Sequence, residues 1–240
     1  MGLFMSVLII IPAYNEEASI LNTVNSVYDY NNTNGTDYDV IVINDGSTDN
    51  TEQILSENRI PHIKLIHNLG IGGAVQTGYK YALLKNYDIA VQFDGDGQHD
   101  VEYVKDLVYE IENGNSNMAV GSRFVSRDKD GFKSSFARRA GIKIISAFIH
   151  LFTGKKVEDC TSGFRACDRK LIELFAKNYP TEYPEPVSEV TVFKKKYKVS
   201  ELPVKMNERQ GGHSSIYAWK SVYYMVNVII AMFTESLKRY

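Results

Sequence analysis

The most informative stretch of this 240-residue chain is Val91-Gln92-Phe93-Asp94-Gly95-Asp96-Gly97-Gln98-His99-Asp100. It begins within the apolar run 89–91 and presents two carboxylates with one glycine between them. Two carboxylates this close repel each other unless a cation lies between them, and their oxygens suit a hard ion such as Mg²⁺ or Mn²⁺. Asp and Gly are also ordinary turn residues, so the stretch alone fits a polar turn after a strand equally well.

Five short apolar runs in the first half of the chain predict β-strands. They cover residues 6–11, 38–43, 63–66, 88–93 and 118–121. Continuous apolar runs of this length are typical of strands buried on both faces, as in a parallel sheet. The segments between them carry apolar residues at helical spacing, as at Ile20, Val24 and Val27. The alternation of strand and helix predicts an α/β fold with a parallel sheet and right-handed crossovers.

A polar cluster follows each of the first four predicted strands. The clusters cover residues 12–17, 44–49, 67–73 and 94–100. Parallel strands bring their carboxyl ends to one edge of a sheet, where ligands bind in open α/β folds. Four separate turns therefore become one candidate site, and this favours a ligand-binding role for Asp94 and Asp96 over a simple turn.

The second half of the chain is less regular. The polar segment 124–136 predicts a loop, and residues 183–186, with two prolines, predict a stiff turn. Helices are expected at 137–152, 168–175, 187–193 and 216–237, and a strand at 197–204. Because no repeat or low-complexity linker interrupts the chain, we predict one domain over residues 1–215 and a C-terminal helix over residues 216–240.

Composition restricts the function. A net charge of -2 argues against a nucleic-acid-binding protein. The cysteines, Cys160 and Cys167, match no common zinc or redox spacing and suggest a reducing compartment. The N-terminal residues lack the pattern of a signal peptide, and no apolar run is long enough to predict a transmembrane span.

Five motifs in this order resemble those of the inverting GT-A glycosyltransferases of family 2, and within them the branch of dolichyl- and polyprenyl-phosphate sugar synthases. The motifs are Pro12-Ala13-Tyr14-Asn15-Glu16-Glu17, Asn44-Asp45-Gly46-Ser47-Thr48-Asp49, Asn68-Leu69-Gly70, Asp94-Gly95-Asp96-Gly97-Gln98-His99 and Thr161-Ser162-Gly163-Phe164-Arg165. The resemblance covers roughly residues 6–215. It implies the GT-A fold, a Rossmann-like, mostly parallel sheet flanked by helices.

The resemblance also implies roles for residues that bind the donor and its metal. Pro12, Ala13, Tyr14 and Glu16 would line the base and ribose pocket, Asp45 would read the base edge, and Gly73 would lie against the nucleotide. Asp94, Gly95 and Asp96 would bracket the ribose and the metal-bound diphosphate, with Gln98 completing the metal shell. Arg209 resembles the late arginine that closes on the diphosphate. His213, in a Gly/Ser-rich turn, is a further candidate for phosphate contact.

The acceptor side is less defined. Inversion onto a hydroxyl needs a general base, whereas a phosphate acceptor is already an anion and needs little or none. Glu185, held between two prolines, is the preferred base and Glu189 the alternative; both also fit a solvated helix surface. We place Arg138, Ser162 and Arg165 on the acceptor side, although Arg138 equally fits a solvated helix face.

The C-terminal segment has an apolar character of its own. Residues 221–234 carry no charge, with tyrosines and Trp219 toward one end and Lys238-Arg239 at the other. This pattern favours a helix at a membrane interface, and a dimer contact or a lid on the core is the alternative. The predicted location is cytoplasmic, peripheral on the inner face of the cell membrane.

These observations predict a metal-dependent glycosyltransferase for cell-envelope glycan synthesis. The donor would be a UDP-, dTDP- or GDP-sugar, with Mg²⁺ or Mn²⁺, because Asp45 accepts equally from the imino group of uracil, thymine or guanine. The acceptor would be a polyprenyl phosphate or a lipid-linked saccharide. A sugar-1-phosphate nucleotidyltransferase would carry a Gly-rich, basic loop after the first strand, which is missing from this sequence. A non-catalytic nucleotide-binding subunit is a further alternative.

Overall fold

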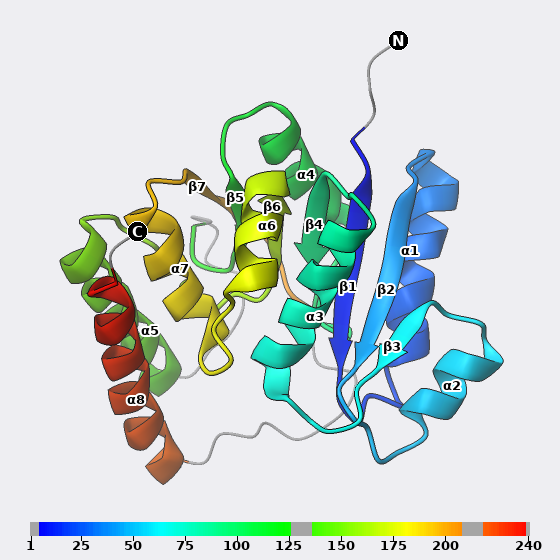
Figure 1. Ribbon diagram of the computed structural model, residues 1–240, viewed down its shortest axis with the longest axis horizontal. Helices are drawn as coiled ribbons and strands as arrows, with labels where there is room; N and C mark the ends of the chain where they lie inside the picture. The colour runs from blue at the N-terminus through cyan, green and yellow to red at the C-terminus, as the bar shows by residue number, and fades with distance from the viewer. Residues whose placement is uncertain (1–4, 126–135, 208–217, 239–240) are drawn as a thin grey trace.

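The computed structural model describes residues 5–125, 136–207 and 218–238, and it contains a seven-stranded sheet in the order β3-β2-β1-β4-β6-β5-β7 (Figure 1). The strands are β1 (Val7–Ala13), β2 (Tyr38–Asn44), β3 (His62–Lys64), β4 (Ile89–Gln92), β5 (Met118–Ser122), β6 (Arg165–Asp168) and β7 (Val199–Pro203). The helices are α1 (Ile20–Asn34), α2 (Thr51–Glu57), α3 (Gly70–Leu84), α4 (Val104–Glu112) after a short 3-10 turn (Val101–Tyr103), α5 (Phe136–Thr153), α6 (Arg169–Lys177), α7 (Pro184–Lys194) and α8 (Ala218–Ser236).

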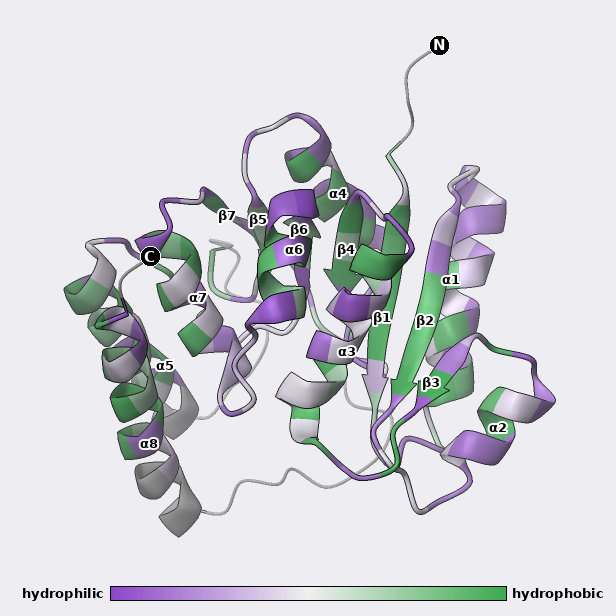
Figure 2. Cartoon of the chain, in the orientation of Figure 1, coloured by the Kyte–Doolittle hydropathy of each residue, from purple (hydrophilic) through white to green (hydrophobic). Residues whose placement is uncertain are grey.

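The first four strands confirm the predicted parallel arrangement. β1 pairs in parallel with β2 on one side and with β4 on the other, and β2 pairs in parallel with β3. Every residue of β1 is buried, as expected for a strand covered on both faces. Apolar residues dominate β1, β2 and β4, which are green along most of their length in Figure 2.

The sheet is mostly parallel, as predicted, and β6, for which the sequence indicated no direction, runs antiparallel to both β4 and β5. Val120 near the end of β5 pairs with Arg165 at the start of β6. The chain therefore leaves β5 and enters β6 at the same edge of the sheet, so β6 must run backwards. This edge is also the one at which β1, β2 and β4 end.

Helices cover both faces of the sheet. Side chains from α1, α2 and α4 pack on the face that includes Val7, Ile9 and Ile11. Side chains from α3 and α6 pack on the opposite face, which includes Leu8 and Ile10. The alternation of side chains along β1 thus supplies both layers of the core.

A third apolar cluster joins α5, α7 and α8 beside the sheet (Figure 1). Its buried members include Ile145 and Ile149 of α5, Val190 of α7, and Val228 and Met232 of α8. A helix therefore lies at the C-terminal end, as predicted, and it shares a core with two others. None of the helices in the described parts of the chain combines the length and apolar character needed to cross a membrane. The boundary predicted between residues 215 and 216 lies outside the described residues.

The expected stiff turn at 183–186 is instead the start of α7. The helix begins at Pro184, because a proline in the first turn lacks only an N–H that would have no partner in the helix. Tyr183 before it has a positive φ of 51°. Glu185 therefore sits in the first helical turn.

Candidate active site

A cavity of about 380 Å³ lies at the carboxyl ends of β1, β2 and β4. The residues that line it are Pro12, Ala13, Tyr14, Glu16, Asp45, Asn68, Gly70, Ile71, Ala74, Asp94, Gly95 and Asp96. Eight of the predicted donor-binding residues are among them. Gly73 is not, because it is buried one turn into α3, where an added Cβ would lie 2.5 Å from Cβ of Leu69.

The loops after β1 and β2 hold each other through side-chain-to-backbone hydrogen bonds. The Thr48 amide donates to Oδ1 of Asn15 (2.8 Å), and the Asn15 amide donates to Oγ of Ser47 (3.0 Å). The Glu16 amide donates to Oγ1 of Thr51 (2.9 Å). These bonds place the two motif loops side by side at the mouth of the cavity.

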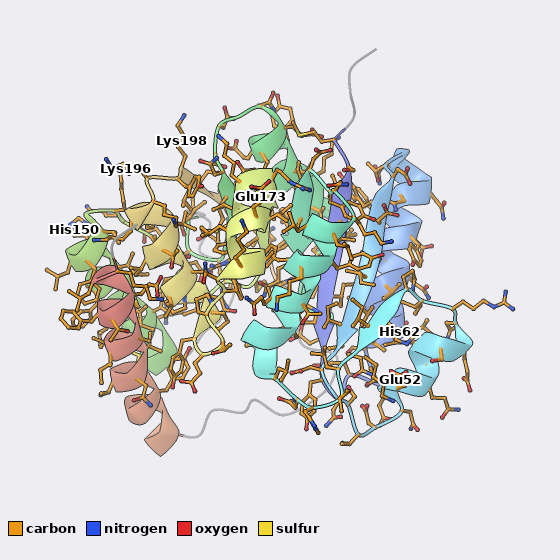
Figure 3. All side chains as sticks on the ribbon, in the orientation of Figure 1. Glu52, His62, His150, Glu173, Lys196 and Lys198 are labelled. Atoms are coloured by element: carbon orange, nitrogen blue, oxygen red, sulfur yellow. The ribbon has the colours of Figure 1, made fainter. Side chains whose placement is uncertain are left out.

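Glu52 supports the Asp45 loop from outside. Its Oε2 accepts a hydrogen bond from the Asn44 side-chain amide (2.7 Å), and Oδ1 of Asn44 accepts one from the Ser47 amide (3.0 Å). Oε1 of Glu52 lies 3.4 Å from Nε2 of His62, and both residues are labelled where α2 meets β3 in Figure 3.

Asp45 links the β2 loop to the start of α3. Its Oδ1 accepts a hydrogen bond from the Leu69 amide (2.7 Å), and the side chain is buried at the cavity wall. Burial raises the pKa of the Asp45 carboxyl, while backbone amides of Leu69 and Gly70 oppose the shift.

Two buried groups orient the carboxylate of Asp94. Its Oδ1 lies 3.4 Å from the side-chain amide of Gln92, and its Oδ2 lies 3.6 Å from Nε2 of His99. The Asp94 amide donates to Nδ1 of His99 (3.0 Å), which assigns the proton of the neutral ring to Nε2, facing the carboxylate. Burial lowers the pKa of His99, and the ring stacks on Phe164 at 4.7 Å.

Asp96 closes a tight turn. Its Oδ1 accepts from the Gln98 amide (3.0 Å), an Asx-type bond, and its side chain is largely buried. Gln98, predicted to complete a metal shell, contributes this backbone bond and does not line the cavity.

The oxygen donors fit a hard divalent cation that is shared with a substrate. In the described residues no three His, Cys, Asp or Glu side chains converge to hold a metal by themselves. Mg²⁺ is commonly held by one or two carboxylates and completed by substrate phosphates and water. Asp94 and Asp96, both at the cavity wall, match that pattern.

The segment 161–165 packs directly against Asp94. A Cβ added to Gly163 would lie 2.8 Å from Nε2 of Gln92 and 3.1 Å from Oδ2 of Asp94. Ser162 is buried and its hydroxyl donates to the Gly121 carbonyl (2.6 Å), so it ties the segment to β5. The Ser162 hydroxyl is therefore engaged inside the protein and is not exposed to an acceptor, contrary to the expectation that it faces one.

Arg165 is also buried, with 1% of its surface exposed, and its guanidinium faces α7. Nη2 donates to Oε1 of Glu189 (2.9 Å) and Nη1 donates to the Glu185 carbonyl (3.1 Å). Glu189 is fully buried, which excludes the solvated-surface interpretation for it, and Glu185 is half-buried.

The two glutamates differ in environment. Burial raises the pKa of Glu189 to about 8, although the charge of Arg165 acts in the opposite direction. Burial also raises the pKa of Glu185; the charge of Arg165 lowers it and that of Asp94 raises it. Asp94 is therefore close enough to Glu185 for its charge to act on that carboxyl.

Comparison with known proteins agrees with this geometry. Residues 8–175 match the model of the family described as glycosyl transferase family 2. The chain belongs to glycosyl transferase family 2. It is 33% identical over 216 residues to a UDP-N-acetylglucosamine–dolichyl-phosphate N-acetylglucosaminyltransferase of Methanococcus voltae, covering 82% of this chain and 84% of that protein.

More distant similarities point the same way. A dolichol-phosphate mannosyltransferase of Pyrococcus furiosus is 29% identical over 88% of this chain and 59% of its own length. A crystal structure of glucosyl-3-phosphoglycerate synthase from Mycobacterium tuberculosis, in complex with Mn²⁺, uridine diphosphate and glucosyl-3-phosphoglycerate, superposes with a TM-score of 0.67. It is 19% identical and covers 97% of this chain and 80% of that one, so it shows the fold alone. The fold of this family 2 glycosyltransferase is therefore GT-A-like.

Three predicted site residues cannot be placed. Arg209 and His213 lie outside the described residues, as does the side chain of Arg138. The neighbouring Arg139 is exposed on α5.

Sequence reasoning missed a second buried ion pair in this glycosyltransferase. Arg123, directly after β5, donates from Nε and Nη2 to the two oxygens of Asp159, both at 2.7 Å, and from Nη2 to Oγ1 of Thr161 (2.8 Å). Glu201 of β7 accepts from the amides of Glu158 and Asp159, both at 2.8 Å. The available signal was the position of Arg123, which follows the apolar run 118–121 as the other polar clusters follow theirs; nothing in the sequence marked Asp159 as its partner.

Proposed function

We propose that this glycosyltransferase transfers a sugar, with inversion, from a nucleotide-diphosphate donor to a polyprenyl phosphate. The observation that carries the proposal is the cavity in which Asp45, Asp94 and Asp96 converge at one sheet edge. The names of the relatives from Methanococcus voltae and Pyrococcus furiosus support a dolichyl-type phosphate as acceptor.

In the proposed reaction, an acceptor phosphate oxygen forms a bond to the anomeric carbon. The bond from that carbon to the donor diphosphate breaks, and the nucleoside diphosphate leaves with the electron pair. A divalent cation, when bound, would stabilise the negative charge of the leaving diphosphate. Asp94 and Asp96 would hold it, and Gln92 and His99 keep the Asp94 carboxylate oriented toward the cavity.

The donor would lie across the ends of β1, β2 and β4. Pro12, Ala13, Tyr14 and Glu16 would form the wall for base and ribose, and Asp45 would meet the base edge. Gly95 has no side chain, and an added Cβ would lie 3.1 Å from the Pro12 carbonyl oxygen, so the turn after β4 packs closely against the end of β1 at the cavity wall.

A donor screen tests this proposal. Purified protein with Mg²⁺ or Mn²⁺ is mixed with UDP-, dTDP- and GDP-sugars, beginning with UDP-N-acetylglucosamine because a relative is named for it. We expect one nucleotide class to raise the melting temperature, and that donor to release its nucleoside diphosphate only when polyprenyl phosphate is added. Binding without transfer to any acceptor would favour the non-catalytic alternative.

The acceptor class is tested by the variant Glu185→Gln. A general base contributes about 10²- to 10⁴-fold to a rate, so transfer to a hydroxyl acceptor should fall by that much. Transfer to a phosphate acceptor should change by less than about 10-fold, because its nucleophile is already an anion. A large loss with polyprenyl phosphate would contradict the proposed acceptor.

A surface on α5 and α8 supports association with a membrane. Val226, Ile230 and Phe233 on α8 and Leu237 directly after it form an exposed stripe, and Ile144 and Leu151 are exposed on α5. The rings of Phe152 and Phe233, with centroids 5.9 Å apart, connect the two helices. We call these six exposed residues the apolar stripe.

Charge favours an anionic lipid surface over a second copy of the chain. Arg139 and Lys143 of α5 and Lys238 after α8 are exposed. Glu235 is the one acidic residue in the sequences of α5 and α8, and it is buried against Thr191 and Lys238. An apolar surface flanked by cations suits anionic headgroups, whereas two copies would bring like charges together. The predicted peripheral location on the inner face of the membrane rests on this surface.

Vesicle cosedimentation tests this association. We expect binding to vesicles that contain phosphatidylglycerol, and loss of it in the double variant Ile230→Glu/Phe233→Glu. Tyr109→Glu is the matched control, because Tyr109 is an exposed apolar residue of α4, away from the stripe. A concentration-dependent dimer that the double variant abolishes, without vesicle binding by the wild type, would assign the stripe to a homodimer instead.

A further inference from the structure

The buried guanidinium of Arg165 connects the two sides of the site. Its Nε donates to the Ser162 carbonyl (2.6 Å), in the segment that packs against Asp94. Its Nη1 donates to the Glu185 carbonyl and to Oγ of Ser188 (2.9 Å), in the first turn of α7. On the sheet, Arg165 pairs with Gln92, whose side-chain amide faces Asp94.

We infer that Arg165 is a positioning residue, which fixes the first turn of α7, and with it Glu185, relative to Asp94. The inference rests on the proposed function, because the first turn of α7 matters only if an acceptor binds between it and the donor. Arg165 itself, 1% exposed, has almost no surface from which to touch a substrate. It acts through the backbone of this turn, whose displacement would obstruct the acceptor whether or not the Glu185 carboxyl takes part in the reaction.

The first turn of α7 needs such a support. In the described residues Tyr183, the residue before α7, makes no side-chain capping bond, and its φ of 51° is unusual for a tyrosine. Pro184 and Pro186 have no backbone N–H to donate. Ser188 completes the support: its Oγ accepts from Arg165 and donates to the Glu185 carbonyl (2.9 Å).

Stability alone does not account for this arrangement. A buried ion pair is often no more stabilising than apolar residues of similar volume. Oε1 of Glu189 pairs with Arg165, whereas Oε2 has no hydrogen-bond partner among the described residues. What the guanidinium supplies, and an apolar side chain lacks, is a rigid set of donors aimed at the two backbone carbonyls of Ser162 and Glu185.

Two single variants test the inference. Ser188→Ala removes the hydroxyl that accepts from Arg165 and donates to the Glu185 carbonyl. Arg165→Lys keeps a positive charge beside Glu189 but loses the planar guanidinium with its fixed set of N–H donors. We expect each to raise the acceptor KM or lower kcat by about 10-fold or more, since small displacements of positioning groups have effects up to about 10²-fold. The Kd of the donor nucleotide, measured by calorimetry, should stay within about 2-fold, because neither Arg165 nor Ser188 lines the donor cavity.

Two control variants match these changes. Arg169→Lys alters the arginine that follows β6 at the opposite sheet edge, where it contacts Tyr87 and Glu173. Thr191→Val removes a hydroxyl one turn along α7, where it bonds Glu235. Both should keep the wild-type acceptor KM, even if Thr191→Val lowers the melting temperature.

A double variant covers the case in which Arg165→Lys does not fold. Arg165→Met/Glu189→Leu removes both buried charges together, an exchange that proteins often tolerate without loss of stability. A folded double variant that binds the donor normally and loses transfer would support the inference. Wild-type acceptor kinetics in it, or donor affinity falling in parallel with transfer, would overturn it. Failure of the proposed function is distinguishable, because then the wild-type protein itself transfers no sugar to the phosphate.

Discussion

The proposed donor side and the proposed acceptor side of this glycosyltransferase are built differently. On the donor side, the polar residues stand in short loops directly after β1, β2 and β4, and neighbouring loops hold one another by bonds such as that from the Thr48 amide to Asn15. On the acceptor side, two buried pairs of an arginine with a carboxyl side chain, Arg123–Asp159 and Arg165–Glu189, join segments 24 to 36 residues apart.

The difference shows two ways of positioning a site. Parallel strands bring consecutive loops to one edge, so the donor side needs only short-range polar contacts to align them. The acceptor side includes an antiparallel strand and helices outside the sheet, so its geometry depends on buried charges. We therefore expect donor-side substitutions to affect chemistry with little loss of stability, and acceptor-side substitutions to affect stability as well.

The largest effect should come from Asp96→Asn. The oxygen of the new side-chain amide can still accept the hydrogen bond from the backbone amide of Gln98. The substitution nevertheless removes a negatively charged oxygen ligand from the cavity. We expect transfer to fall by about 10³-fold, the scale of losing one electrostatic group of a transition state. The melting temperature should remain near that of the wild type. Unchanged transfer in the presence of Mg²⁺ or Mn²⁺ would show that Asp96 holds no metal.

Asp159→Asn should show the opposite behaviour. It removes the buried carboxylate that pairs with Arg123 at 2.7 Å, so we expect the free energy of unfolding in a urea titration to fall by about 3 kcal/mol. Glu173→Gln breaks the exposed pair with Arg169 and should cost less than about 1 kcal/mol. Equal losses in the two variants would contradict the proposed importance of buried pairs on this side.

Gly163→Ala probes the point where the two sides meet. The new Cβ would lie 2.8 Å from the Gln92 amide and 3.1 Å from Asp94, so one of them must move. We expect about a 10-fold loss of transfer, because a displaced Asp94 carboxylate would no longer be placed to hold the proposed metal ion. Gly141→Ala on α5 is the control, since its Cβ would make an ordinary 3.6 Å contact with Met225. Wild-type rates in Gly163→Ala would mean that Asp94 tolerates displacement.

The smallest effect should be a pH dependence of stability carried by Glu189. Burial raises its pKa from an ordinary 4.5 to about 8, so between these values the folded protein binds more protons than the unfolded chain. The contribution of Glu189 to the free energy of unfolding therefore falls as pH rises from 5 to 8. Glu189→Gln lacks this dependence.

Denaturation of both proteins across that range measures the difference. As the pH rises from 5 to 8, we expect the free energy of unfolding of Glu189→Gln to increase by about 1 kcal/mol or more relative to that of the wild type. The exposed Glu173→Gln controls for the loss of one carboxylate. A constant difference between Glu189→Gln and the wild type across this range would show that Glu189 stays ionised beside Arg165.

Much of the donor side could be predicted from sequence. The five apolar runs of the first half became β1 to β5, and the clusters after β1, β2 and β4 meet in one cavity. Strand periodicity and turn chemistry are local properties, and the parallel topology converts them into a site. Gly73 is the exception, because which face of α3 meets the cavity depends on packing.

The acceptor side could be predicted only in outline. Arg165 and Ser162 were expected to face an acceptor, but the structure buries both. The reason is the antiparallel β6, which turns Arg165 toward α7, where Glu185, Ser188 and Glu189 accept its hydrogen bonds. Burial of a charge depends on a partner that is distant in the sequence, and sequence patterns do not reveal such partners.

The sequence by itself determined the family, the strand and helix order of the first half, and the two carboxylates at the end of β4. These follow from residue type and spacing along a short stretch of chain. Only the tertiary structure decided the direction of β6, the start of α7 at Pro184, and the pairing of Arg165 with Glu189. Each of these depends on the contacts between segments far apart in sequence, where packing and desolvation outweigh local preference.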